Sequence, residues 1–158
     1  MSIVRILVDG YSLLHKWPQL APGKQRHTEA ARDALVETLT HYRDAIGTPI
    51  TVVFDGGGAP KGAPKAHSTR DFEVLFSRKR NTADDLIERA TQRLIEYGEV
   101  LVVTDDYAER DTVAFLGALT SSCAGFIDAV ESALGSMSDD IEKFNRRERK
   151  RYQRQGSK

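Results

Sequence analysis

The sequence predicts an α/β fold, in which a mostly parallel central sheet carries helices on both faces. Three short runs of aliphatic and β-branched residues indicate its buried strands: 3–8, 50–54 and 100–104. Runs that are apolar on both faces are typical of central strands in such sheets. Each run ends on carboxylates: Asp9, Asp55, and the pair Asp105 and Asp106. Because the carboxyl ends of parallel strands meet at one edge, where ligands bind, these carboxylates are the main functional signal.

The length and composition predict one soluble domain. The chain has 158 residues, of which 40% are hydrophobic and 29% charged. No apolar run approaches the ~20 residues that a membrane-spanning helix needs. The first core strand begins at residue 3, so we expect neither a signal peptide nor a transit peptide. Cys123 is the single cysteine, expected in the core, which excludes an internal disulfide and favours a cytoplasmic location.

Charge is unevenly distributed, although its formal sum is zero. Residues 146–158 carry seven Lys or Arg and one Glu, a net charge of +6, which leaves −6 on the rest of the chain. An acidic body with a basic tail suits a protein that binds metal at one place and a polyanion at another, although a solvated helix end has the same composition. We expect one domain over residues 1–135 and a basic helical tail over residues 136–158.

The first strand leads into an apolar turn closed by Pro18 and a polar loop over residues 20–27. A helix is predicted from Thr28, a suitable N-cap, to Gly47, a usual residue after a helix end. Five apolar residues form its buried stripe: Ala31, Leu35, Leu39, Tyr42 and Ile46. With the second strand directly after it, this helix completes a βαβ unit for which a right-handed crossover is expected.

A long basic loop over residues 56–70 separates the second strand from a short third one. Apolar and polar side chains alternate in residues 72–76, which predicts a strand near an edge of the sheet. Basic residues on both sides of this strand are candidates for phosphate contacts: Lys61, Lys65, Arg78, Lys79 and Arg80.

The second half of the chain is predicted to be mainly helical. Thr82 with Asp85 approximates a capping box, so a helix begins there and ends at Gly98. After the fourth strand, two short helices interrupted by Gly117 and Gly125 are expected over residues 108–134. A last helix is expected from Ser138.

The carboxylates each have a structural explanation. Asp9 and Asp55 suit turns, Asp106 suits a helix cap, and Asp84 and Asp85 suit a first helical turn, where they favour the helix dipole. Four separate explanations at one edge are less convincing than one shared cause. Crowded carboxylates repel one another unless a cation lies among them, and Mg²⁺ or Mn²⁺ prefers oxygen ligands. Such a site would orient and deprotonate water for phosphodiester cleavage.

Other chemistries fit the sequence less well. Gly57 and Gly62 have the spacing of a P-loop, but Ala63 and Pro64 stand where Lys and Ser or Thr are required. No G-x-G-x-x-G follows the first strand, and the chain has no G-x-S-x-G. The four histidines lack metal-ligand spacing and are expected at the surface: His15, His27, His41 and His67.

Five blocks occur in order along the chain: Asp9-Gly10-Tyr11, Trp17-Pro18-Gln19-Leu20, Val52-Val53-Phe54-Asp55, Thr82-Ala83-Asp84 and Asp106-Tyr107. Together they resemble the YacP-like branch of the NYN domains, which are PIN-like, metal-dependent ribonucleases. The resemblance covers residues 3 to about 118. It implies a three-layer α/β/α sandwich that cleaves RNA, with Asp9, Asp84 and Asp106 as ligands of Mg²⁺ or Mn²⁺ and Asp55 close by.

Three positions depart from the family pattern. Ser12 stands where the family usually has Asn and offers one hydroxyl on a shorter stem, which is expected to slow cleavage. Asp105 stands where Ser is common and adds a carboxylate beside Asp106. Residues 120–125 replace a segment that usually carries basic residues, so the tail from Arg146 is expected to supply positive charge instead.

These observations predict a cytoplasmic, metal-dependent endoribonuclease with RNA as its partner and possible ribosome association, and with neither a membrane partner nor a nucleotide cofactor. Asp85, Asp105 and Ser12 would support the ligands, and Arg146 and Arg147 would join the RNA contacts. Tyr11 and Trp17 are candidates for base stacking, with packing in the core as the stronger expectation. Two alternatives remain open. One is an RNA- or ribosome-associated binding module with little or no catalysis, and the other, with less support, is a phosphohydrolase with other substrates.

Overall fold

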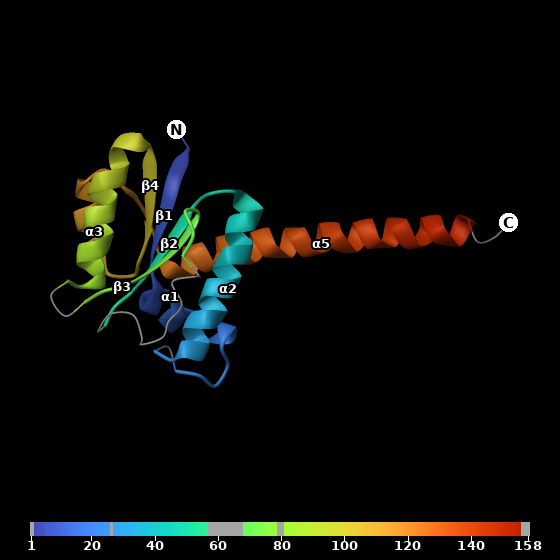
Figure 1. Cartoon of the computed structure of the whole chain (residues 1–158), viewed down its shortest axis with the longest axis horizontal. Helices are drawn as coiled ribbons and strands as arrows, with labels where there is room; N and C mark the ends of the chain where they lie inside the picture. The colour runs from blue at the N-terminus through green and yellow to red at the C-terminus, as the bar shows by residue number, and fades with distance from the viewer. Residues whose placement is uncertain (1, 26, 57–67, 79–80, 156–158) are drawn as a thin grey trace.

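The computed structural model describes residues 2–25, 27–56, 68–78 and 81–155, and a five-stranded sheet forms its centre (Figure 1). The strands are β1 (Ile3–Asp9), β2 (Ile50–Phe54), β3 (Phe72–Phe76), β4 (Glu99–Val103) and β5 (Leu119–Ser121). Their order is β3-β2-β1-β4-β5, and every pairing is parallel. The predicted α/β fold is therefore confirmed, with β1 at the centre and β3 at an edge.

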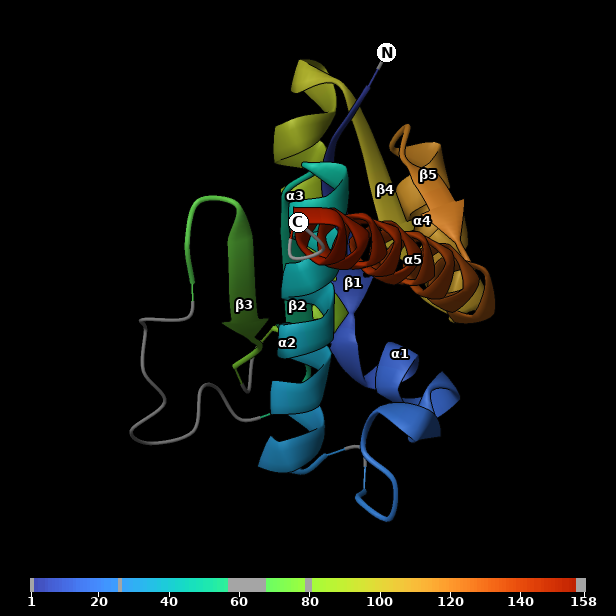
Figure 2. The same ribbon diagram turned by 90° about the vertical axis from the view of Figure 1, so that its right-hand side faces the viewer.

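Helices cover both faces of the sheet (Figures 1 and 2). One face carries α1 (Gly10–Lys16), the 3-10 turn η1 (Pro18–Leu20), α2 (Glu29–Ile46) and the first part of α5 (Cys123–Gln155). The other face carries α3 (Ala83–Leu94), which the 3-10 turn η3 (Ile95–Tyr97) extends, and α4 (Tyr107–Phe115). Alternation along β1 supplies both cores, because Ile6 and Val8 pack on the first face and Leu7 packs on the second.

Helix α2 begins and ends where the sequence predicts. The Thr28 hydroxyl accepts a hydrogen bond from the Ala31 N–H at 3.2 Å, which caps the first turn. At the other end, Gly47 has a φ of 74°, and its N–H donates to the Arg43 carbonyl at 2.7 Å. Of the predicted stripe, Ile46 alone is exposed, because it lies in the last turn beyond the edge of the core.

Three predictions about the connecting segments are wrong. The apolar turn after β1 is the helix α1, and a short strand, β5, follows α4. The residues from Cys123 onward form one helix, so Gly125 does not interrupt a helix and no separate helix starts at Ser138. Gly125 is tolerated because it lies in the first turn, where its N–H donates to the Ser122 hydroxyl at 3.0 Å.

Helix α5 projects far beyond the body of the molecule (Figure 1). Its first part is buried through Cys123, Phe126, Ile127 and Val130. Further along, the side chains of residues 141–147 are exposed, so the expected boundary between residues 135 and 136 falls inside one continuous helix. Among the described residues, no helix is long and apolar enough to cross a membrane.

Candidate active site

The centre of the candidate site is Asp9, the last residue of the central strand β1. Asp9 caps helix α1, and its Oδ1 accepts a hydrogen bond from the Ser12 N–H at 3.3 Å. The chain turns into α1 at Gly10, where a Cβ would lie 2.4 Å from a ring carbon of Phe54. A larger residue at this turn would therefore displace the Phe54 ring or the start of α1, and the packing of Phe54 against Gly10 holds the backbone beside Asp9.

Asp106 caps α4 in the same way at the end of the neighbouring strand. Its Oδ1 accepts hydrogen bonds from the N–H groups of Ala108 and Glu109, at 2.9 and 3.3 Å. Its own N–H donates to the Thr104 hydroxyl at 3.2 Å. Among the described residues, nothing donates to Oδ2 of Asp9 or of Asp106. One oxygen of each carboxylate therefore remains for a ligand.

Asp84 and Asp55 reach the same edge from α3 and β2. A capping box starts α3, in which Asp85 Oδ2 accepts from the Thr82 N–H at 3.1 Å and the Thr82 hydroxyl accepts from the Asp85 N–H at 3.2 Å. This cap occupies Asp85 and places Asp84 in the first turn. Asp55 follows β2, and its Oδ1 accepts a hydrogen bond from the Ser77 hydroxyl at 2.7 Å, which joins the ends of β2 and β3.

Electrostatic coupling shows that these carboxylates form one group. Burial is the main cause that raises the pKa of the Asp9 carboxyl, the Ser12 N–H lowers it, and the negative charges of Asp84, Asp55 and Asp106 raise it; the net result is a pKa of about 6. Burial also raises the pKa of Asp84, with Asp106 as the next cause. The structure therefore places Asp9, Asp55, Asp84 and Asp106 near enough to one another to interact, and the charged forms of Asp9 and Asp84 are disfavoured there unless a cation is present.

Two further carboxylates, which the sequence analysis missed, extend this group. Glu109 is only 3% exposed, and its Oε1 has no hydrogen-bond partner among the described residues. Burial first, then the charges of Asp84 and Glu88, a side-chain hydrogen bond with Glu88 and the charge of Asp106 together raise the pKa of Glu109 to about 8. The spacing of Asp84 and Glu88, four residues apart on one helix, was a usable sequence signal for Glu88. The burial of Glu109 depends on how α4 packs, which no local pattern indicated.

The supporting positions Ser12 and Asp105 hold the backbone around the site. Asp105 Oδ1 accepts a hydrogen bond from the Cys123 N–H at 2.9 Å and pairs with Arg110 at 3.3 Å. The Ser12 hydroxyl accepts from the Asp105 N–H at 3.4 Å. These contacts connect the end of β4 with α1 and with the start of α5. Cys123 is buried, as predicted.

The donor set consists of carboxylate oxygens, which are the ligands that a hard divalent cation prefers. Asp9 and Asp84 are half-buried, Asp55 and Asp106 are exposed, and the buried Glu109 adds an Oε1 without a partner among the described residues. Within the described parts of the chain, however, no three His, Cys, Asp or Glu side chains lie close enough together to hold a metal ion. The caps leave Oδ2 of Asp9 and Asp106 without a donor among the described residues. A coordination shell that includes them would need the other carboxylate side chains to rotate towards them.

The predicted RNA contacts are only partly described by the structure. Arg78 is exposed directly after β3, at the same edge as Asp55. Arg146 and Arg147 are exposed on the projecting part of α5. Four of the predicted contacts lie outside the described residues: Lys61, Lys65, Lys79 and Arg80.

Comparisons with known proteins show the family of the chain. A sequence model described as YacP-like NYN domain matches residues 6–158. A protein of Bacillus subtilis strain 168 named Uncharacterized protein YacP is 35% identical over 128 residues, which cover 80% of this chain and 75% of that protein.

Two solved structures are similar over most of the chain. The crystal structure of Rae1 (YacP) from Bacillus subtilis has a TM-score of 0.78 at 30% identity and covers 94% of this chain and 84% of the other. The W164L mutant of the same protein gives a TM-score of 0.76 at 31% identity, with 90% and 84% covered.

Proposed function

Because the chain belongs to the YacP-like NYN domain family, whose members are generally nucleases, we propose that it is a divalent-metal-dependent endoribonuclease. The observation that carries the proposal is the coupling of Asp9 with Asp55, Asp84 and Asp106 at one edge of the sheet. Carboxylates in such a group repel one another, and a bound cation would remove that repulsion. The group therefore has the charge and the chemistry of a metal site for phosphodiester cleavage.

Each carboxylate has a distinct part in this proposal. Asp9, Asp84 and Asp106 would hold Mg²⁺ or Mn²⁺, and Asp55 would lie beside them, held by Ser77. When bound, the ion lowers the pKa of water and neutralises charge on the phosphate. The caps of α1 and α4 hold Asp9 and Asp106 at the strand ends, so their backbone needs little reorganisation when a substrate binds.

Positive charge away from the carboxylates would hold the RNA. Arg78 at the end of β3, and Lys61, Lys65, Lys79 and Arg80 in sequence, would contact phosphates near the site. Arg146 and Arg147 would contact a second stretch of RNA, including ribosomal RNA, at the projecting part of α5. A cytoplasmic location and an association with the ribosome belong to this proposal.

Charge-removing substitutions test the metal ligands. Asp9→Asn, Asp84→Asn and Asp106→Asn keep a side-chain oxygen for helix capping but remove the charge. Each should lower the single-turnover rate of RNA cleavage in Mg²⁺ or Mn²⁺ by about 100-fold or more, because several kcal/mol of transition-state stabilisation are lost. Asp111→Asn, at an exposed position of α4, is the matched control and should cleave like the wild type. Full activity in the three variants, or wild-type cleavage in excess EDTA, would contradict the proposal.

A second candidate is an RNA-binding module without catalysis. The absence of three closely spaced metal-ligating side chains among the described residues favours it. Such a module would bind RNA with the same salt dependence, but purified protein would release no cleavage product with either metal. The rate measurements above therefore separate the two candidates.

A further inference from the structure

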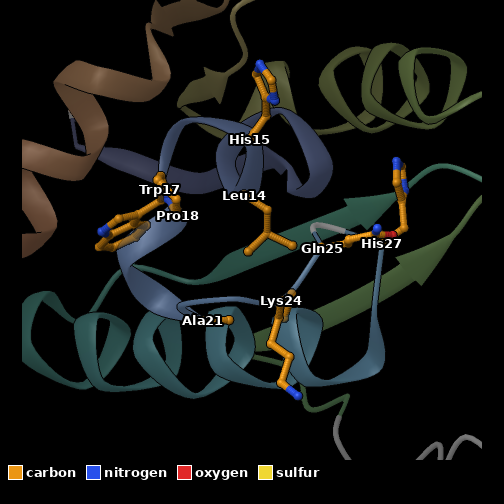
Figure 3. A pocket seen from close by; sticks show the side chains of 9 residues that line it. Leu14, His15, Trp17, Pro18, Ala21, Lys24, Gln25 and His27 are labelled. Carbon is orange, nitrogen blue, oxygen red and sulfur yellow. The ribbon is translucent and has the colours of Figure 1, made fainter.

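A hollow of about 380 Å³ lies between α1, η1 and the start of α2 (Figure 3). Its apolar part comes from buried side chains of Leu14, Trp17 and Ala31. Exposed polar side chains surround this part: His15, Lys24, Gln25 and His27. Figure 3 shows Leu14 in the midst of the labelled side chains, with His15 above it and Lys24 below it, both pointing away from Leu14, and His27 to the right.

The described lining of the hollow is positively charged through Lys24, in contrast to the acidic body around it. No carboxylate is among the described lining residues, which also include two histidines as hydrogen-bonding groups. Outside the basic tail the chain has a net charge of −6. A hollow with an apolar floor, and with a lysine and hydrogen-bonding groups at its rim, suits a flat aromatic ring that carries an adjacent phosphate. That combination is a nucleotide.

The hollow and the carboxylates lie at two ends of the same short helix. Asp9 caps the start of α1, and Leu14 and His15 lie near its end. The five residues from Asp9 to Leu14 correspond to a rise of about 8 Å. Tyr11 lies between the hollow and the carboxylates. Its ring centroid is 4.4 Å from that of His27, which lines the hollow, and 5.1 Å from that of Phe54, which packs beside Asp9.

Arg32 of α2 contacts the residues that lie between the hollow and the carboxylates. The sequence analysis did not identify this residue. Its Nη1 donates to the His27 carbonyl at 2.7 Å and to the Tyr11 hydroxyl at 3.3 Å. Its guanidinium carbon lies 5.8 Å from the centroid of the Phe76 ring. These contacts fix Tyr11 and the backbone of His27 before any ligand arrives, which lowers the entropic cost of binding.

We propose that this hollow is a base-binding subsite, which receives a nucleobase of single-stranded RNA next to the phosphodiester at the strand-end carboxylates. The inference rests on the proposed function, because it gives the nuclease a second point of contact with its substrate. In this subsite the base lies against the apolar side chains. Lys24 and His15 contact its edge or the neighbouring phosphate.

Trp17 provides a direct readout, because it is the single tryptophan of the chain and lines the hollow. The wild-type protein is titrated in EDTA with a trinucleotide of RNA and with an abasic trinucleotide of equal charge. The base-containing ligand should bind about 5-fold or more tightly and should change the Trp17 fluorescence, whereas the abasic ligand should not. Equal affinities and equal fluorescence would overturn the subsite.

Variants at exposed positions separate this subsite from general charge effects. Lys24→Glu and His15→Ala should bring the ratio of the two affinities close to 1. Lys16→Glu changes charge at an exposed position of α1 that does not line the hollow, and it should keep the wild-type ratio. If Lys24→Glu and His15→Ala keep the ratio, the base binds elsewhere and the inference fails.

Two further arms separate the possible outcomes. A mononucleotide that binds as tightly as the trinucleotide would make the hollow a site for free nucleotides and would overturn the inference for RNA. Metal-dependent cleavage of a longer RNA is measured on the same preparations. If the protein cleaves the RNA but binds the base-containing and the abasic ligand equally, the subsite is overturned and the nuclease is retained. If it binds the base-containing ligand more tightly but does not cleave, the subsite is supported and the nuclease is overturned.

Discussion

Asp9 and Asp106 each cap a helix with one carboxylate oxygen and leave the other oxygen without a donor among the described residues. At each of these positions one side chain can have both roles, because one oxygen caps the helix and the other is available to a ligand. Asp85 differs, because it takes part in a capping box, and Asp105 differs because it holds the start of α5 and Arg110. The presence of an aspartate in the sequence therefore does not distinguish a helix cap from a candidate ligand, whereas the hydrogen bonds of its carboxylate oxygens do.

Glu109 predicts a fall in stability with rising pH when no metal is present. Its pKa is about 8 in the folded state against an ordinary value of 4.5, so the folded state keeps a proton that the unfolded state releases. Its contribution to stability is complete below the unfolded pKa and is lost as the pH rises through about 8, by at least ~1 kcal/mol. The charges that face it belong to Asp84, Glu88 and Asp106.

Urea unfolding in EDTA from about pH 5 to about pH 9 measures this effect. Glu109→Gln should flatten the fall, whereas Glu131→Gln, at an exposed position of α5, should keep the wild-type profile. A Glu109→Gln profile that matches the wild type would contradict this explanation.

Gly10→Ala should destabilise the protein and displace Asp9. A Cβ at this position would lie 2.4 Å from the Phe54 ring, so the ring or the start of α1 must move, at a cost of about 1–3 kcal/mol. Thermal or urea unfolding gives the stability, and the cleavage rate reports the position of Asp9. Gly135→Ala is the matched control, because nothing lies within 4 Å of a Cβ there, and helix propensity should leave stability unchanged or higher. Equal stability of the wild type and Gly10→Ala would rule out the packing argument.

The helices and strands that the sequence predicted correctly are those whose position depends on local interactions. Helix α2 follows its caps and its apolar stripe, and β3 follows its alternation. The continuous helix α5 was not predicted, since Gly125 was read as an interruption, whereas its first-turn position follows from Ser122 capping the helix. Strand β5 is three residues long and pairs only with β4, so its formation depends on contacts that sequence periodicity does not contain.

The capping box of α3 predicts a measurable stability difference. Thr82→Ala removes the hydroxyl that accepts from the Asp85 N–H, and it should lower the free energy of unfolding by about 1 kcal/mol. Thr82→Ser keeps an acceptor at the same place and should stay close to the wild type. Urea unfolding compares the two variants. A Thr82→Ser variant as unstable as Thr82→Ala would show that the methyl group, rather than the cap, matters.

At the scale of the whole molecule, opposite charges are separated in space. The body carries the carboxylate edge, and the basic residues between Arg146 and Arg154 lie on the part of α5 that leaves the body (Figure 1). Sequence composition predicted this asymmetry, but it did not predict that the tail continues a helix whose first part is buried in the core. The described side chains of residues 141–154 are mostly exposed, so the tail is free to contact a partner without any rearrangement of the fold.

Deletion of residues 146–158 should weaken RNA affinity and flatten its dependence on salt. Each lost phosphate contact should lower the slope of log affinity against log salt by roughly 0.7 on single-stranded RNA. The thermal stability should change little, because the deleted residues that the structure describes lie far along the exposed part of α5. Binding at several salt concentrations measures the slope, and an unchanged slope would mean that the tail makes no phosphate contact.

The continuity of α5 gives the molecule a fixed reach. From residue 136 to residue 155 the helix rises about 30 Å, and a helix, unlike a flexible linker, keeps its tip at a set distance and direction from Asp9. If the tip contacts a polyanion, as proposed, the distance between that contact and the strand-end carboxylates is set by the number of helical residues. Insertion of four residues would extend this reach by about 6 Å and would turn the tip by roughly 40°.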